Sequence, residues 1–351
     1  MNPDSIQGQS EDDPPTIHLC SDSEIADVMR YIEENWMAGH IMAHSKRLVD
    51  FQHRNPHGGY HFIVYGNRAK ITALLGFIPT SQYDPALLPE KAVWPAIWKN
   101  TGDPGDGLGL IEKLISQYDF VGSIGINPKV AKLYRVLGFT LGELTHYYIL
   151  NRETSDFRIA LLTAPPAETE ATDDEAGADL RAVGPDELLN SNVKGVYLPL
   201  KTGRFFVNRY LRHPYYEYKV YGVINKKETE IRAFLAVRAI EVNGSRCLRI
   251  VDALGDLAAC GCLNGALQKL MQDENAEYTD LMNYGLPEDL FRRHGFLVSD
   301  AEHIIPNYFE PFVRENIRIR FAVLNKTPRP FVVFKGDSDQ DRPNRIPAGG
   351  E

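Results

Sequence analysis

Residues 127–139 read Asn-Pro-Lys-Val-Ala-Lys-Leu-Tyr-Arg-Val-Leu-Gly-Phe, and the assignment of the fold depends on them. The last seven have the form L-[YF]-R-x-x-G-F, which returns at 290–296, a shift of 157 (290 minus 133). By itself this form marks a helix stopped by a C′ glycine with an apolar contact beyond it. A second match, Val-Tyr-Gly at 64–66 and 220–222, gives a shift of 156 (220 minus 64). Two matches with nearly equal shifts indicate an internal repeat.

The length of the chain also favours two domains. A chain of 351 residues can bury two cores, and its 43% hydrophobic and 24% charged residues are typical of globular proteins. The composition changes around the acidic stretch 168–175, which predicts a solvated linker. We therefore expect a mobile tail at 1–15, a first domain at 16–163, an acidic linker at 164–187, a second domain at 188–335 and a polar C-terminal segment at 336–351.

Charge and targeting signals limit the classes of partner. The net charge is −9, and there is no block rich in Lys and Arg, which argues against nucleic acid and anionic lipid as main partners. The N-terminus does not have the pattern of a signal peptide, and no stretch approaches 18 consecutive apolar residues. A cytoplasmic location follows as the expectation. Cys260-Gly-Cys262 lacks zinc spacing, so no metal is expected; the oligomeric state is not written in the sequence.

Local patterns in the first half predict alternating strands and helices. The aromatic and β-branched runs 60–65 and 71–78 predict a β-hairpin. Pro95 lies inside a predicted strand, 91–98, and demands a bulge or an unpaired edge. The remaining expected elements are a glycine-rich loop at 102–109, a helix at 110–118, a strand at 121–126, a helix at 128–137 and a strand at 141–151.

The order strand, glycine-rich loop, helix is the strongest chemical signal. Glycines allow backbone N–H groups to approach a diphosphate, and a helix start adds unpaired donors and a positive dipole. Gly105-Asp106-Gly107-Leu108-Gly109 has this character, although Asp103 and Asp106 oppose phosphate binding. A flexible turn is the alternative interpretation.

This loop, followed by N-x-x-A-x-x-L-Y-x-x-x-G-F at 127–139, resembles the GCN5-related N-acyltransferase (GNAT) superfamily. The resemblance implies an α/β (α+β) chain of two GNAT-like domains, each a mixed, mostly antiparallel twisted sheet flanked by helices. It implies acyl-CoA as co-substrate, with acetyl-CoA as the expected form. The diphosphate would lie on Gly105, Asp106, Gly107, Leu108 and Gly109, the pantetheine near Trp98 and Asn127, and Tyr134 would protonate the leaving thiolate.

Two departures from the family pattern stand out. The family's loop begins with Arg or Gln three residues before its first motif glycine, whereas this chain has Gly102 or Pro104 there. In the second half, Phe291 replaces the tyrosine and cannot donate a proton. We therefore expect a degenerate second domain that packs against the first or forms one wall of a substrate cleft.

Proton acceptors and substrate contacts are less sharply indicated. His53 and His146 are the predicted bases for the amine, and His40, Asp50, Asp280, Asp341 and Arg342 are the predicted substrate contacts. The acidic run at 335–344 fits either a solvated turn or a polar substrate-binding edge, and it lacks the full calcium loop. Carboxylates and Asn in such an edge would suit a hydroxyl-rich acceptor.

These features predict an acyl-CoA-dependent N-acyltransferase that acts on a small polar amine. The whole-chain pattern also looks like tandem GNAT-like proteins of bacterial surface-polysaccharide biosynthesis, which implies a nucleotide-linked amino sugar as acceptor. Two alternatives stay open. One is a Fem-type aminoacyl transferase that uses aminoacyl-tRNA, and the other is a non-catalytic binding or regulatory protein that kept the fold.

Overall fold

The structure is a computed structural model that describes residues 14–67, 70–164, 177–226 and 228–347. It contains two large sheets whose strands follow one another in the same order. The first sheet runs β1 (Thr16–Leu19), β2 (Phe62–Gly66), β3 (Ile71–Pro79), β4 (Ala92–Asn100), β5 (Phe120–Ile124), β18 (Arg320–Asn325) and β6 (Thr140–Glu143). The second runs β9 (Ala178–Val183), β10 (Lys219–Asn225), β11 (Ile231–Val242), β12 (Ser245–Gly255), β13 (Tyr278–Tyr284), β7 (Thr145–Leu150) and β14 (Leu297–Val298).

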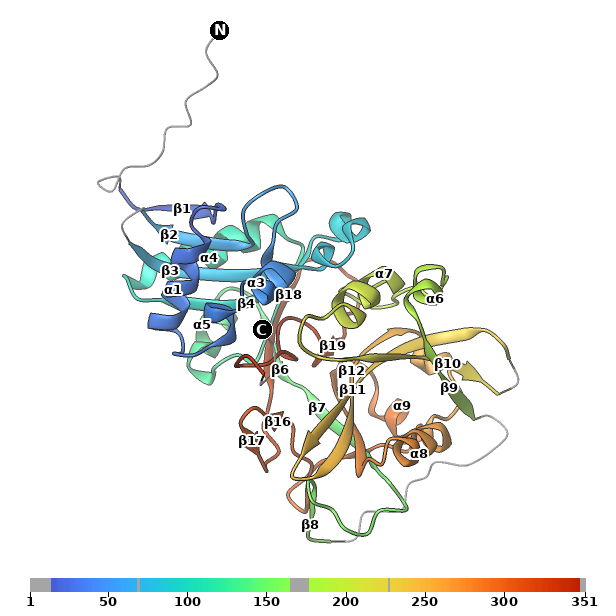
Figure 1. The fold of residues 1–351 in the computed structure, drawn as a ribbon. Coiled ribbons are helices and arrows are strands. Elements are labelled where there is room, and N and C mark those ends of the chain that lie inside the picture. The colour runs from blue at the N-terminus through green and yellow to red at the C-terminus, as the bar shows by residue number, and fades with distance from the viewer. Residues whose placement is uncertain (1–13, 68–69, 165–176, 227, 348–351) are drawn as a thin grey trace.

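The two sheets exchange one strand. β18, from the second half of the chain, lies between β5 and β6, and β7, from the first half, lies between β13 and β14. Figure 1 shows β7 among the strands of the second sheet. The prediction of one strand at 141–151 is therefore wrong, because the chain leaves the first sheet at buried Leu144, whose N–H donates to the carbonyl of Ile319. The first sheet thus includes β18, which lies outside the predicted first domain at 16–163. The second sheet includes β7, which lies outside the predicted second domain at 188–335.

Helices cover both faces of the first sheet. α1 (Ile25–Asn35), α2 (Ile41–His44) and α3 (Lys46–His53) pack on one face, against Phe62 and Val64. α4 (Pro104–Gln117) and α5 (Ala131–Val136) pack on the other face, against Ile63 and Leu75. Successive strand residues point to opposite faces, so strands that are apolar at nearly every position are buried on both sides.

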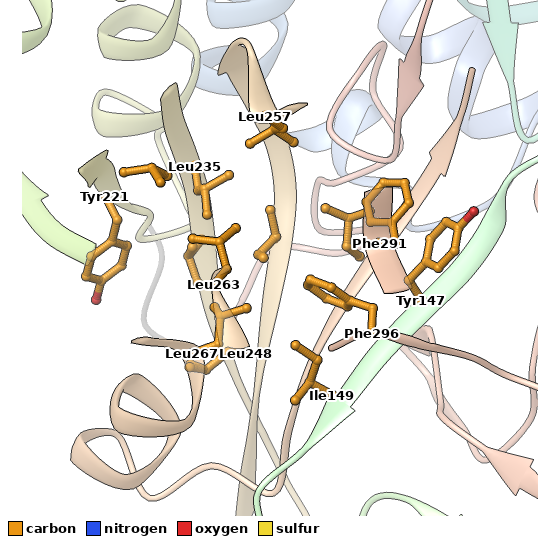
Figure 2. Packing of buried hydrophobic residues seen from close by; sticks show 14 of the residues in the cluster. Tyr147, Ile149, Tyr221, Leu235, Leu248, Leu257, Leu263, Leu267, Phe291 and Phe296 are labelled. Carbon is orange, nitrogen blue, oxygen red and sulfur yellow. The ribbon is translucent and has the colours of Figure 1, made fainter. Parts of the chain in front are cut away.

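The second sheet is covered in a similar way. α8 (Asn264–Asp273) and α9 (Glu288–Arg293) pack on one face (Figure 2). On the other face lie α6 (Pro185–Leu189), α7 (Gly203–Phe206) and η4 (Val207–Leu211), in a cluster that also takes in Ile78, Tyr83 and Leu87 from the first half. The shorter elements are η1 (Thr80–Gln82), η2 (Pro85–Glu90), η3 (Pro128–Val130), η5 (Leu257–Ala259), β8 (Leu161–Leu162), β15 (His303–Ile304), β16 (Tyr308–Phe309), β17 (Phe312–Val313) and β19 (Val333–Phe334).

The repeated segment folds in the same way in both halves. Gly138 and Gly295 follow the helices with φ of +86° and +85°, a backbone conformation that glycine adopts without strain. In each copy the next residue, Phe139 or Phe296, donates its N–H to the carbonyl of the aromatic residue five positions earlier. The helix stop predicted from the sequence is therefore present twice.

The predicted linker and tail lie partly outside the described residues, which do not include 1–13 and 165–176. The end of the predicted linker is folded, since β9 pairs with β10 over six residue pairs and α6 begins at Pro185. The expectation of a solvated linker as far as 187 is wrong for this part. Ala178 and Val183 are buried in β9, and the flanking acidic residues mask this short strand in the sequence. No helix in the described ranges has the length and apolarity to cross a membrane.

Candidate functional site

A cavity opens where β4 and β5 separate. The two strands are parallel and pair only through Ala92–Phe120 and Val93–Val121. Beyond these pairs lies a cavity of about 660 Å³, which we call the splay cavity. Its walls come from the end of β4, the start of α4, the end of β5, α5, and Trp36 after α1.

The wall formed by β4 contains the bulge predicted from Pro95. Phe77 of β3 faces Pro95 and Gly76 faces Ile97, so Ala96 is the extra residue. A bulge leaves its extra residue outside the ladder and bends the strand. Pro95 and Ala96 both line the splay cavity, so the bulge turns β4 away from β5 at the point where the cavity begins.

Tyr134 reaches the splay cavity from α5. Its side chain is 3% exposed, and its hydroxyl donates a hydrogen bond to Ser123 Oγ at 3.0 Å. Its ring meets the edge of Trp98, with centroids 5.9 Å apart. Burial raises the pKa of Tyr134, and the bond to Ser123 lowers it to a smaller extent. The phenol is therefore protonated at neutral pH and held at a defined position in the wall.

The predicted glycine-rich loop at 102–109 is wrong, because α4 already begins at Pro104. Asp103 is the N-cap, Pro104 is at N1, and Asp106 closes a capping box by accepting the N–H of Asp103 at 3.1 Å. These start signals outweigh the low helix propensity of the three glycines. Gly107 and Leu108 line the splay cavity, whereas Gly105, Asp106 and Gly109 are not among its lining residues in the described chain.

The remaining predicted cofactor contacts lie around the same cavity. Trp98 lines it, and its indole Nε1 donates to the carbonyl of Gly107 at 3.1 Å, which fixes the start of α4 against β4. Asn127 also lines it and caps η3, accepting the N–H of Lys129 at 3.0 Å. The wall is mostly apolar and suits a pantetheine arm. The start of α4 fits a diphosphate less well, because the capping box takes up the N–H groups of Asp103 and Asp106 and places two carboxylates there.

A second cavity, of about 240 Å³, lies between the two halves of the chain, and we call it the polar cavity. Trp36 lines both cavities. Gln340 lines the polar cavity and packs on Gly125 of the splay cavity so closely that a Cβ on Gly125 would come within 2.6 Å of its Oε1. The two cavities are therefore neighbours.

The C-terminal segment forms one wall of the polar cavity. Asp337, Ser338, Asp339 and Asp341 are at most 4% exposed, so the interpretation as a solvated turn is wrong. Each of its three buried aspartates has a cationic partner: Asp337 pairs with Lys201, Asp339 with Arg342 and Asp341 with Arg238. Ion pairing explains how such an acidic run can be buried.

Three of the predicted substrate contacts line the polar cavity, namely His40, Asp341 and Arg342. Burial and, to a smaller extent, Arg342 lower the pKa of His40 to about 4, so its imidazole is neutral at neutral pH. Asp50 lies elsewhere, on α3, where it accepts hydrogen bonds from Lys46 and Tyr60. Asp280 lies in β13, where it pairs with Arg249, a residue that lines the cavity.

The two predicted bases lie outside both cavities as the described residues define them. His53 packs on Phe62, and its Nδ1 bonds to the carbonyl of Phe77 at 3.0 Å. Burial lowers the pKa of His53 to about 4. His146 lies on the exchanged strand β7, where its Nε2 bonds to Asp280 at 2.9 Å. The structure thus does not bring either imidazole to Tyr134.

The equivalent position in the second sheet is filled. β12 and β13 are parallel and pair over only three residue pairs, and the matching strands of the first sheet, β4 and β5, pair over only two. The cavity beside them measures only about 30 Å³. It is lined by Phe334 of β19 and by Val332, which precedes that strand. Phe291, which corresponds to Tyr134, stacks on Tyr147 with centroids 4.0 Å apart (Figure 2). Among the described residues, the space between the diverging strands is therefore large on the first sheet and small at the matching position on the second.

Sequence reasoning did not single out several lining residues, notably Trp36, Ser123, Arg249 and Glu310. One signal was present: Arg249 stands in the apolar run Leu248 to Val251, and Asp280 in the run Tyr278 to Met282. A charge inside a buried strand needs a buried partner of opposite sign. Pairing these two charges would have predicted a buried ion pair between two strands of the second sheet.

The comparisons with known proteins agree with this architecture. No family model matches the chain, and no curated protein matches its sequence. The GCN5-related N-acetyltransferase from Anabaena variabilis has a TM-score of 0.52 at 11% identity, over 90% of this chain and 73% of that chain. The GCN5-related N-acetyltransferase from Kribbella flavida has a TM-score of 0.50 at 12% identity, over 90% and 72%. These likenesses show the fold, and the prediction of two GNAT-like α/β domains is confirmed.

Proposed function

We propose that this protein transfers an acyl group from acyl-CoA, with acetyl-CoA as the expected donor, to a small polar amine. The splay cavity carries the proposal, because it combines an apolar channel between two diverging strands with a protonated phenol in its wall. The proposal is also supported by the fold shared with two solved structures described as N-acetyltransferases. An amino sugar is the acceptor that the sequence resemblance favours.

The chemistry needs one nucleophile and one proton donor. The nitrogen of the amine attacks the thioester carbonyl and forms the C–N bond, and the C–S bond then breaks. Tyr134 would give its proton to the departing thiolate, while the nitrogen loses a proton to solvent and the phenol is reprotonated. Ser123 accepts the hydrogen bond of Tyr134 and would hold the phenol in place between turnovers.

The reaction is tested by measuring amine-dependent release of free CoA from acetyl-CoA. A panel of amines, amino sugars and nucleotide-linked amino sugars is expected to contain at least one that accelerates thiol release above the rate without amine. If none of them does so while the protein is folded, the assignment as an N-acyltransferase is wrong. A non-catalytic binding protein would then be favoured, because the capped start of α4 is the feature that least suits a CoA enzyme.

Asp106→Asn is expected to tighten the binding of acetyl-CoA. The amide oxygen can still accept the N–H of Asp103, so the capping box survives while one negative charge leaves the helix start. Removing a charge near a diphosphate in water is worth about 1 kcal/mol, or roughly a fivefold lower Kd. Isothermal titration at low and high salt measures the effect, which salt should reduce.

Glu112→Gln is the matched control, because Glu112 is an exposed carboxylate on the same helix, outside the splay cavity as its lining residues are described. Its Kd for acetyl-CoA is expected to stay within twofold of the wild type. An equal change in both variants would mean that only net charge matters. No change in Asp106→Asn would place the diphosphate away from α4.

A further inference from the structure

The polar cavity is walled by charged groups that are nearly all paired. Arg249 donates two hydrogen bonds to Asp280, from Nε to Oδ1 at 2.9 Å and from Nη2 to Oδ2 at 2.5 Å. Burial alone would raise the pKa of Asp280, but Arg249 and the bond from His146 outweigh it and lower the pKa to about 2. With Arg238–Asp341 and Arg342–Asp339, three arginines of the wall are thus neutralised.

Lys335 is the exception. It lines the cavity and is 6% exposed, yet its ammonium forms neither a hydrogen bond nor an ion pair with any residue in the described part of the chain. Burial, and then repulsion by Arg249, lowers its pKa to about 8, with Asp341, Arg238 and Asp280 as the other charges that act on it. A buried cation without a partner costs free energy unless a ligand supplies the opposite charge.

Glu310 is the complementary group in the same wall. Its carboxylate accepts hydrogen bonds from the Tyr216 hydroxyl at 2.6 Å and from the Asn344 N–H at 3.2 Å. Both donors are neutral, so Glu310 has no cationic partner among the described residues. The cavity therefore offers one unpaired cation and one unpaired anion.

We propose that the polar cavity binds the acceptor as a small zwitterion, with a carboxylate or phosphate of the acceptor at Lys335 and its amine at Glu310. The inference rests on the proposed function, in that it names the class of amine. The shared wall at Trp36 and the contact of Gln340 with Gly125 put the polar cavity next to the splay cavity, where the acyl donor is proposed to bind.

The size of the cavity restricts the acceptor further. Ligand pockets usually measure about 300–1,000 Å³. The polar cavity, at about 240 Å³, lies below that range and suits an amino acid or an aminoalkyl phosphate. An acceptor that carries a whole nucleotide would have to leave most of that nucleotide outside.

Binding of inorganic phosphate and of acetate tests the anion subsite without any catalysis. Lys335→Met keeps an unbranched side chain in place and removes the charge, while Lys269→Met removes the same charge from an exposed position on α8. Isothermal titration is expected to show that at least one anion binds the wild type and Lys269→Met equally. Lys335→Met should bind that anion at least tenfold more weakly. Equal binding by Lys335→Met, or no binding of either anion to the wild type, overturns the proposal.

Matched acceptors identify the anion and test the amine end. CoA release is measured with phosphoethanolamine against ethanolamine, and with glycine against glycinamide. One amine that carries an anionic group is expected to exceed its partner without that group at least tenfold in kcat/KM. Glu310→Gln, which retains an acceptor for Tyr216, should weaken binding of that charged amine and leave phosphate or acetate binding unchanged. If the amines without an anionic group react as well as those with one, the inference is contradicted. Anion binding at Lys335 without CoA release from any amine contradicts the proposed function and leaves the anion subsite intact.

Discussion

Tyr134→Phe is expected to lower kcat for acetyl transfer by about 10²- to 10⁴-fold, the usual contribution of a general acid. The substitution removes one hydroxyl and keeps the ring, so the contacts with Trp98 and Phe139 persist. The Kd for acetyl-CoA should therefore stay within about twofold of the wild type. Steady-state CoA release and isothermal titration on the same preparations measure the two quantities.

Ser123→Ala separates the proton donor from its support. This variant keeps the phenol of Tyr134 and removes the acceptor of its hydrogen bond, so kcat should fall by much less than in Tyr134→Phe. Equal kcat in Tyr134→Phe and wild type would refute the assignment of Tyr134 as proton donor. A loss of acetyl-CoA binding in Tyr134→Phe would make Tyr134 a binding residue instead.

Lys201→Met is expected to lower the free energy of unfolding by about 3–5 kcal/mol, which is the usual cost of removing one partner of a buried ion pair. Lys201 Nζ lies 2.5 Å from Asp252 Oδ1 and 2.9 Å from Asp337 Oδ1, and all three side chains are at most 6% exposed. The variant leaves two carboxylates buried without their cation. Urea denaturation at neutral pH measures the loss.

The loss should shrink as the pH falls. Burial, opposed by Lys201, raises the pKa of Asp337 in the folded protein, and removing Lys201 raises it further. The folded variant then binds a proton that the unfolded chain still lacks, so its stability increases towards acid pH. Adding Asp252→Asn and Asp337→Asn to Lys201→Met should recover much of the stability at neutral pH. A single variant within 1 kcal/mol of the wild type would show that the pair contributes little.

The sequence predicted the local elements of the first sheet well, because their signals are local. The hairpin of β2 and β3, the bulge at Pro95 and the glycine stops at Gly138 and Gly295 all follow from neighbouring residues. The start of α4 was misread because glycines suggested a loop. The capping signals of Asp103 and Pro104 were equally visible, and they determined the outcome.

The exchange of β7 and β18 and the composition of the polar cavity could not be predicted in the same way. A strand's alternation of apolar residues fixes which face is buried, but it does not say which of two equivalent sheets the strand joins. The polar cavity takes residues from the segment after α1, from β11 and β12, and from the C-terminal segment, which are brought together only by that exchange and by the packing of the two halves. Lys335 and Glu310 therefore gain their significance from the structure.

Titration of acetyl-CoA into three proteins tests whether the splay cavity holds the acyl donor. Leu133 lines the cavity from α5, and Val136, three residues later on the same helix, is 76% exposed and is not among the lining residues described. Leu133→Trp fills part of the cavity, whereas Val136→Trp adds the same indole at the surface. Wild type and Val136→Trp are expected to bind acetyl-CoA with equal Kd, and Leu133→Trp is expected to bind it at least tenfold more weakly. No binding to the wild type, or equal binding by all three proteins, would contradict a donor site between β4 and β5.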